Sequence, residues 1–162
     1  MNKSKDHPTI FQSAPVVDVS VSQSFSFDEG TVINDGQGST GDNVVDNNVE
    51  CAGQHFIVDF WGAKFLQDVH VLESALTDAA HVAGAVLLHI HLHKFASGGG
   101  ITGVALLAES HISVHTWPER EYAAFDVFMC GGAKPERAVA LLEEVFKPSR
   151  VNVHRIVRGE GE

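Results

Sequence analysis

The densest group of reactive side chains lies between residues 108 and 131. It combines an alcohol, two imidazoles, three carboxylates and a thiol, at Glu109, Ser110, His111, His115, Glu119, Asp126 and Cys130. A serine beside a histidine suggests a hydrolase triad, but the sequence has no G-x-S-x-G elbow around Ser110. Ser110 also lies between two predicted strands and not on a strand-to-helix turn. The residue types therefore predict nucleophilic or proton-transfer chemistry of another kind.

Three histidines at alternate positions of a predicted strand form a second group. His89, His91 and His93 would point to one face of that strand, and the apolar residues between them to the other. Zinc needs its ligands about 2.1 Å from one point, whereas residues two apart on a strand are about 6.6 Å apart. The stripe is interpreted as a polar sheet face that lines a site or a subunit contact, with metal binding as the alternative.

Alternating strand and helix patterns from Cys51 onward must position these groups. Strands are predicted at 55–61, 85–94, 102–108, 111–116, 122–129 and 151–157, and helices at 67–83 and from Pro135 to before Pro148. This order predicts an α+β two-layer sandwich, in which a mainly antiparallel sheet carries two helices on one face. The other face of the sheet must then be solvated or paired.

The first 50 residues differ in composition from the remainder. They carry 2 Lys against 8 Asp and Glu, and they include the polar stretch 34–48. Such a composition buries too little apolar surface to offset chain entropy. We expect residues 1–50 to be a mostly disordered acidic extension, with a weakly held strand at 15–21, and residues 51–162 to form the folded domain.

Charge and composition exclude several classes of protein. A formal net charge of −10, with 11 scattered Lys and Arg, argues against binding to nucleic acid or to an anionic membrane surface. The sequence has neither an apolar run of spanning length nor a signal peptide, so a cytoplasmic location is expected. Two cysteines, Cys51 and Cys130, make no disulfide framework and no thiol-rich metal site.

One continuous run resembles a known family. The sequence E-S-H-I-S-V-H-T-W-P-E at 109–119, followed by Y-A-A at 122–124 and D-V-F-M-C-G at 126–131, closely resembles the prokaryotic S-adenosylmethionine decarboxylase proenzymes. The likeness extends from about His55 to Val157, and the N-terminal 50 residues lie outside it. It implies a pyruvoyl-dependent enzyme that is made as a zymogen and cleaves itself.

The resemblance implies a cut between Glu109 and Ser110. The Ser110 hydroxyl would attack the preceding carbonyl to form an ester, and His115 matches the family's base that removes the Ser110 Cα proton. Elimination and hydrolysis would then leave a covalent pyruvoyl group on the chain 110–162, separated from the chain 1–109. Thr102 matches the position of a family serine that steadies the oxyanion, and a threonine keeps that hydroxyl while adding a methyl group.

Catalytic and substrate contacts follow from the same likeness. The pyruvoyl carbonyl would form a Schiff base with the substrate's amine and act as an electron sink for decarboxylation, with Cys130 as the proton donor. Glu119 matches a carboxylate that binds the ribose hydroxyls, and Phe95 an aromatic residue that stacks on adenine. Arg120 and Glu121 stand where family members often have tyrosine and glycine.

The resemblance therefore implies a lyase that converts S-adenosylmethionine to its decarboxylated form and CO₂, for spermidine and other polyamines. It also implies a homo-oligomer of αβ protomers with sites near the subunit contact, and we expect no metal. An acidic residue such as Glu121 suits a free basic amino acid, so a pyruvoyl-dependent ornithine or arginine decarboxylase is one alternative. An unprocessed binding or regulatory protein is the other.

Overall fold

The structure, a computed structural model, describes residues 51–161. The predicted extension 1–50 and its strand at 15–21 lie outside the described residues. The described elements are β1 (Gly53–Trp61), α1 (Val69–Val82), β2 (Leu87–Lys94), β3 (Ile101–Leu107), β4 (Ser110–Trp117), a short 3₁₀ helix η1 (Pro118–Arg120), β5 (Tyr122–Met129), α2 (Pro135–Phe146) and β6 (Arg150–Arg158).

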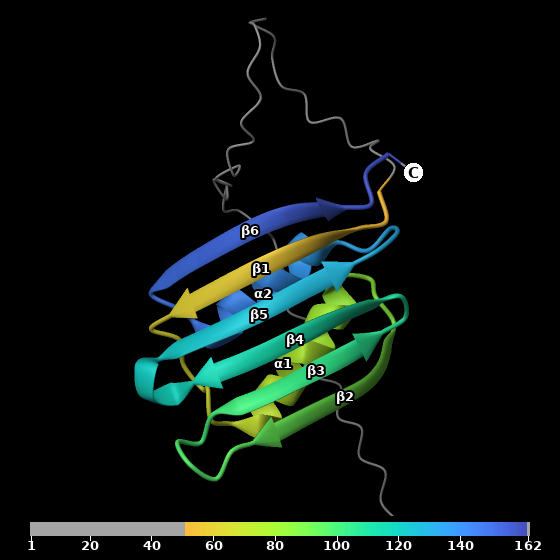
Figure 1. Cartoon of the computed structure of the whole chain (residues 1–162). Helices are drawn as coiled ribbons and strands as arrows, with labels where there is room; N and C mark the ends of the chain where they lie inside the picture. The colour runs from red at the N-terminus through yellow and green to blue at the C-terminus, as the bar shows by residue number, and fades with distance from the viewer. Residues whose placement is uncertain (1–50, 162) are drawn as a thin grey trace, which may run out of the picture.

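The strands form one six-stranded sheet in the order β2-β3-β4-β5-β1-β6 (Figure 1). Every neighbouring pair is antiparallel. Both helices lie on one face of the sheet, where α1 packs against β2 and β3 and α2 packs against β1 and β5. The predicted two-layer α+β sandwich is confirmed.

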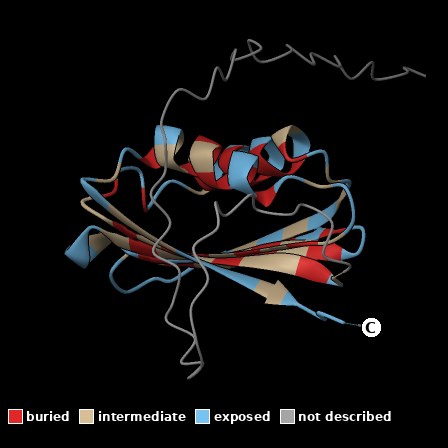
Figure 2. Ribbon diagram, turned by 90° about the horizontal axis from the view of Figure 1, so that it is seen from above, coloured by how far each residue is buried: buried red, intermediate tan, exposed pale blue. Residues whose placement is uncertain are grey.

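Strand alternation decides which residues enter the core between the two layers. On β1 the buried residues Phe56, Val58 and Phe60 alternate with half-buried ones, and β4 and β5 show the same period of two. The rings of Phe60 and Phe146 each pack on Phe125, with centroids 5.3 and 5.5 Å apart. Figure 2 shows that burial is concentrated where the helices meet the sheet.

The helix ends follow from local chemistry. The Asp68 carboxylate accepts the backbone N–H groups of His70 and Val71, at 3.0 and 3.2 Å. Because Asp68 caps α1, the helix begins at Val69, two residues after the predicted start at residue 67. Helix α2 begins at Pro135 as predicted and ends at Phe146, where Lys147 turns into the left-handed region with a φ of 46°.

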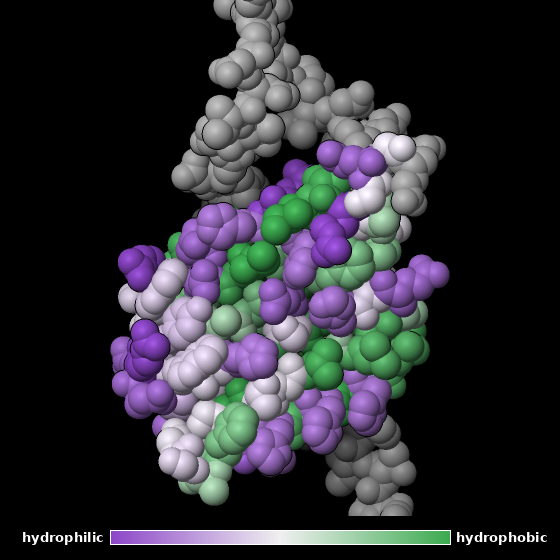
Figure 3. Space-filling model, in the orientation of Figure 1, coloured by the Kyte–Doolittle hydropathy of each residue, from purple (hydrophilic) through white to green (hydrophobic). Residues whose placement is uncertain are grey.

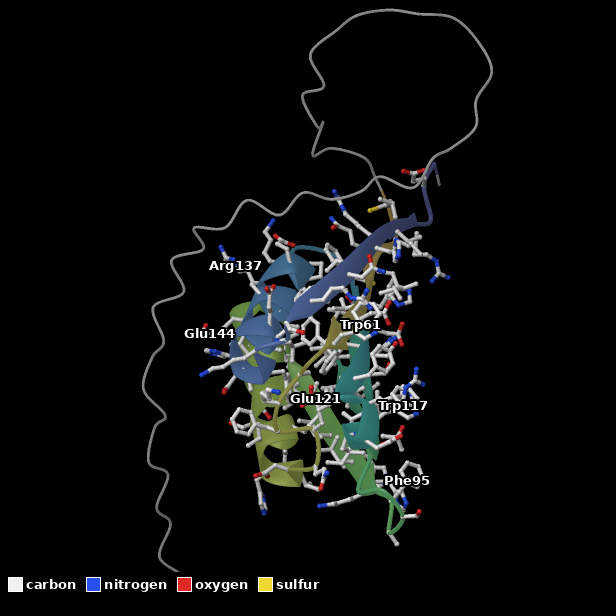
Figure 4. All side chains as sticks on the ribbon, turned by 90° about the vertical axis from the view of Figure 1, so that its left-hand side faces the viewer. Trp61, Phe95, Trp117, Glu121, Arg137 and Glu144 are labelled. Atoms are coloured by element: carbon white, nitrogen blue, oxygen red, sulfur yellow. The ribbon has the colours of Figure 1, made fainter. Side chains whose placement is uncertain are left out.

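The face of the sheet that the helices leave uncovered mixes polar and apolar side chains. We call it the open face. Figure 3 views it directly and shows hydrophilic and hydrophobic residues interspersed across the strands. Trp61, Trp117 and Phe95 project from this side, away from the helix that carries Arg137 and Glu144 (Figure 4). Within residues 51–161, no helix has the length and apolar character needed to cross a membrane.

Candidate active site

Ser110 and Cys130 meet at one end of the sheet. Ser110 is the first residue of β4, and Cys130 directly follows β5. The two strands pair with His111 opposite Phe128, so the hairpin folds back residues 20 positions apart onto each other. The backbone N–H of Cys130 donates to the Ser110 Oγ at 3.2 Å, and Ser110 is only 8% exposed. A shielded hydroxyl is thus fixed next to the residue that carries the thiol.

The peptide bond before Ser110 belongs to a tight turn. Ala108 and Glu109 connect β3 to β4, and Leu107 pairs with Ser110 across the turn. Glu109 has a φ of 64°, a left-handed conformation that costs a non-glycine residue about 1–2 kcal/mol. A cavity of about 460 Å³ opens here, lined by His55, Leu106, Leu107, Glu109, Ser110, His111, Phe128 and Arg158. We call it the serine cavity.

Four other predicted site residues share a second cavity. It has a volume of about 750 Å³, and its lining includes Phe95, Thr102, His115 and Glu119. Strands β3 and β4 place Thr102 opposite His115, and the Thr102 Oγ1 and His115 Nδ1 atoms form a hydrogen bond of 2.8 Å. We call this second cavity the imidazole cavity. It combines a hydroxyl, an imidazole, a carboxylate and a half-exposed aromatic ring.

The serine cavity and the imidazole cavity are separate in one chain. Ser110 and His115 are five residues apart on β4, which at about 3.3 Å per residue is roughly 16 Å. Ser110 shares the buried face of β4 with Ile112 and Val114, whereas the exposed His115 is on the open face. The structure therefore brings Ser110 to Cys130 and Thr102 to His115, but it does not bring His115 to Ser110.

The open face also carries two separate groups of polar contacts. The Asp126 carboxylate accepts a hydrogen bond from the Ser113 hydroxyl at 2.9 Å and lies 3.5 Å from the Nε2 of His55. The Tyr122 hydroxyl donates a short hydrogen bond to Asp59. Partial burial, and then this bond to a carboxylate, raise the pKa of Tyr122 to about 12, so the phenol stays protonated in the physiological range.

Known proteins match the folded part of the chain. The family model for S-adenosylmethionine decarboxylase matches residues 54–159. The chain belongs to the S-adenosylmethionine decarboxylase family. A proenzyme of that name from Thermomicrobium roseum is 41% identical over 108 residues, which cover 66% of this chain and 93% of the relative. One from Methanococcus maripaludis strain S2 is 46% identical over 110 residues, covering 66% of this chain and 89% of the relative.

A solved structure agrees with this membership. The adenosylmethionine decarboxylase from Aquifex aeolicus superposes with a TM-score of 0.63 at 33% sequence identity, over 70% of this chain and 95% of that one. The family resemblance predicted from the run at 109–131 is confirmed. The roles of individual residues within it remain predictions.

The three histidines of β2 occupy the outer edge of the sheet. His89, His91 and His93 pair with Leu106, Val104 and Thr102 of β3, and all three are exposed on the open face. Among the described residues, no group of three or more His, Cys, Asp or Glu side chains is close enough to hold a metal ion. The stripe belongs to the same surface as the two cavities.

Glu121 lies away from the predicted substrate residues. Its carboxylate pairs with the Lys64 ammonium at 3.2 Å and lines a different cavity, beside the start of α1. Phe95 and Glu119, by contrast, line the imidazole cavity. Glu121 is therefore not arranged to receive a basic substrate there, which removes the structural reason for preferring a free basic amino acid.

The serine cavity also holds residues that sequence reasoning missed. His55, Phe128 and Arg158 line it from β1, β5 and β6. Phe128 lies in the quoted run, and the pairing of β4 with β5 brings it to the serine. His55 and Arg158 lie far from Ser110 in sequence and outside that run, and only the pairing of β1 with both β5 and β6 brings them there, so no local pattern could have revealed them.

Proposed function

We propose that the chain is a self-processing decarboxylase that acts on S-adenosylmethionine and releases CO₂. The observation that carries this proposal is the hydrogen bond from the Cys130 N–H to the shielded Ser110 Oγ at a strained turn. This hydrogen bond joins the serine that would be processed to the cysteine whose thiol is the predicted proton donor. Family membership makes this pair the natural centre of the reaction.

The chain's own residues account for the cut. The Ser110 hydroxyl attacks the Glu109 carbonyl, so that a C–O bond replaces the C–N bond. The left-handed conformation of Glu109 raises the energy of the uncut turn, which favours a step that releases it. A base then takes the Ser110 Cα proton and the Oγ–Cβ bond breaks. An imidazole suits this step because its pKa lies near neutral pH.

The pyruvoyl group that results supplies a carbonyl to hold the electrons released with CO₂. Cys130 is assigned the return of a proton to the substrate carbon, and the bond from its backbone N–H to the Ser110 Oγ keeps the thiol-bearing residue next to the processed residue.

A second copy of the chain completes the site in this proposal. His115 is the predicted base, yet it is roughly 16 Å from Ser110 along its own strand. The serine cavity reaches the open face through His55, His111 and Phe128, although Ser110 itself is in phase with the buried side of β4. A two-fold symmetric pair packed through the open faces therefore sets the serine cavity of one copy against the imidazole cavity of the other. Two equivalent sites result, each with Ser110 and Cys130 from one protomer and Thr102 and His115 from its partner.

The imidazole cavity then provides the substrate contacts. The Glu119 carboxylate can accept hydrogen bonds from two ribose hydroxyls, and the half-exposed Phe95 ring offers a face for a purine. The Thr102 hydroxyl is held by His115 at 2.8 Å, next to where the oxyanion of the cut would form. A nucleoside substrate fits this set of groups.

Mass spectrometry of the purified full chain tests the proposal. We expect fragments 1–109 and 110–162, the second with a ketone in place of a free amino terminus, and an uncut Ser110→Ala control. CO₂ release should be seen from S-adenosylmethionine but not from ornithine or arginine. A folded chain that stays in one piece would exclude the mechanism, whereas a cut chain that decarboxylates ornithine or arginine instead would exclude only the substrate.

A further inference from the structure

The serine cavity contains an arginine that the proposed mechanism does not use. Arg158 is the last residue of β6, and its Cζ atom lies 5.9 Å from the centre of the Phe128 ring. Within residues 51–161 the ion pairs are His55 with Asp126 and Lys64 with Glu121, so Arg158 has no carboxylate within 4 Å. Its guanidinium N–H donors are therefore available to bind a negative charge that forms in this cavity.

The proposed cut creates that charge at Glu109, which lines the same cavity as Arg158. One water and the Glu109-Ser110 peptide become a carboxylate on Glu109, a ketone at position 110 and an ammonium ion. The amide C–N bond and then the Oγ–Cβ bond break, and the serine nitrogen leaves as ammonia. Glu109 thereafter carries two negative groups, its new α-carboxylate and its side chain, where the uncut chain has one.

Arg158 is the best partner for this end in the cavity. Among the described residues that line the cavity, the other side chains that can become cationic are the imidazoles of His55 and His111. A guanidinium stays charged, and its planar donors match a carboxylate in a two-bond geometry.

The register of β1 and β6 places Arg158 opposite a residue without a side chain. Arg158 pairs with Gly53 of β1, which has no side chain. A Cβ atom at position 53 would lie 3.0 Å from the ring of Phe128 and 2.7 Å from the carbonyl oxygen of Met129. The glycine therefore leaves room for the Phe128 ring, whose centre lies 5.9 Å from the Cζ atom of Arg158.

We infer that Arg158 binds the carboxylate end that self-cleavage creates at Glu109. Resting on the proposed function, it acts as a positioning residue that holds the end of β3 beside the modified residue 110. Without this contact the doubly negative end would lack its one guanidinium partner among the described residues that line the cavity. This contact can form only in the cut protein, because the uncut turn has no α-carboxylate at Glu109.

A double-mutant cycle between Arg158 and the cut tests this. Arg158→Met is compared with its parent in the full chain, once in the self-cleaving form and once in the uncut Ser110→Ala form. We expect Arg158→Met to lower the melting temperature of the cut form by about 4–8 °C and that of the uncut form by no more than about 1–2 °C. The difference should shrink in 1 M salt, and Arg158→Lys should restore part of it.

The matched control is Arg155→Met on the same strand. Arg155 donates from its Nε to the Gln54 side chain at 3.2 Å and does not line the cavity, so its loss should affect cut and uncut forms equally. Equal shifts for Arg158→Met in both forms would overturn the inference. A raised KM of the cut enzyme together with equal melting-temperature shifts in the two forms would also overturn it, and would instead assign Arg158 to the substrate's carboxylate. A parent chain that is never cut would be the failure of the proposed function, and mass spectrometry of the parent reports it separately.

Discussion

Two variants that each fail to cleave themselves should regain self-cleavage when one chain of each kind forms a mixed dimer. One chain carries Ser110→Ala and cannot be cut, and the other carries His115→Ala and lacks the base. Proton transfer needs heavy atoms about 3 Å apart, whereas the strand separates the two residues by roughly 16 Å in one chain. If the open faces pair, the intact Ser110 of the second chain meets the intact His115 of the first.

The expected yield follows from the symmetry of the pair. Random association after co-expression at equal levels makes about half of the dimers mixed, and each mixed dimer has one intact site of two, so about a quarter of the wild-type number of sites is restored. Mass spectrometry identifies the cut chain. The 53-residue fragment 110–162 (162 − 110 + 1) should carry the His115→Ala substitution, because only that chain has a serine to process.

The same substitutions combined on one chain provide the control. Co-expressed with wild-type chain, the double variant should leave about half of the wild-type chains uncut, since each mixed dimer then has no intact site. Absence of any cut in the first mixture, despite folded mixed dimers, would refute the shared site. Cutting of the His115→Ala chain expressed alone would refute the role of His115.

Four other outcomes are expected. Cys130→Ala should leave the cut intact but lower kcat by about 10²–10⁴-fold, measured as CO₂ release, and unchanged turnover would remove Cys130 from the mechanism. Glu119→Gln should raise KM for S-adenosylmethionine by about 10–100-fold without affecting the cut, as judged by mass spectrometry. Burial raises the pKa of Glu143, and its Oε2 atom has no hydrogen-bond partner among the described residues. The free energy of unfolding therefore falls as the pH rises from the unfolded-state pKa of this carboxyl to its folded-state pKa. Glu143→Gln should therefore raise the melting temperature by about 1–3 °C at pH 7 and by nothing below about pH 4, and a gain that grows on acidification would contradict this. Deleting residues 1–50 should leave turnover nearly unchanged, because the family match begins at residue 54, and a large loss of turnover would show that the extension contributes to the site.

Local sequence patterns were sufficient to predict the strands, the helices and the family. The alternation in 122–129 and the proline positions at 135 and 148 predicted β5 and α2 because side-chain period and backbone restriction act within a few residues. The start of α1 was predicted two residues early because an apolar period does not report a cap, and the Asp68 side chain decides the first turn.

The run 109–131 was enough to predict the candidate groups, because it contains the serine, the imidazole and the thiol in the order that the family resemblance implies. Which of these groups lie next to each other in one chain depends on the fold. Strand pairing folds Cys130 back onto Ser110, while the rise of an extended strand carries His115 roughly 16 Å away on the other face. Likewise, β6 brings Arg158 to the serine cavity across the sheet, because strand register is fixed by packing over the whole domain and not by neighbours in sequence.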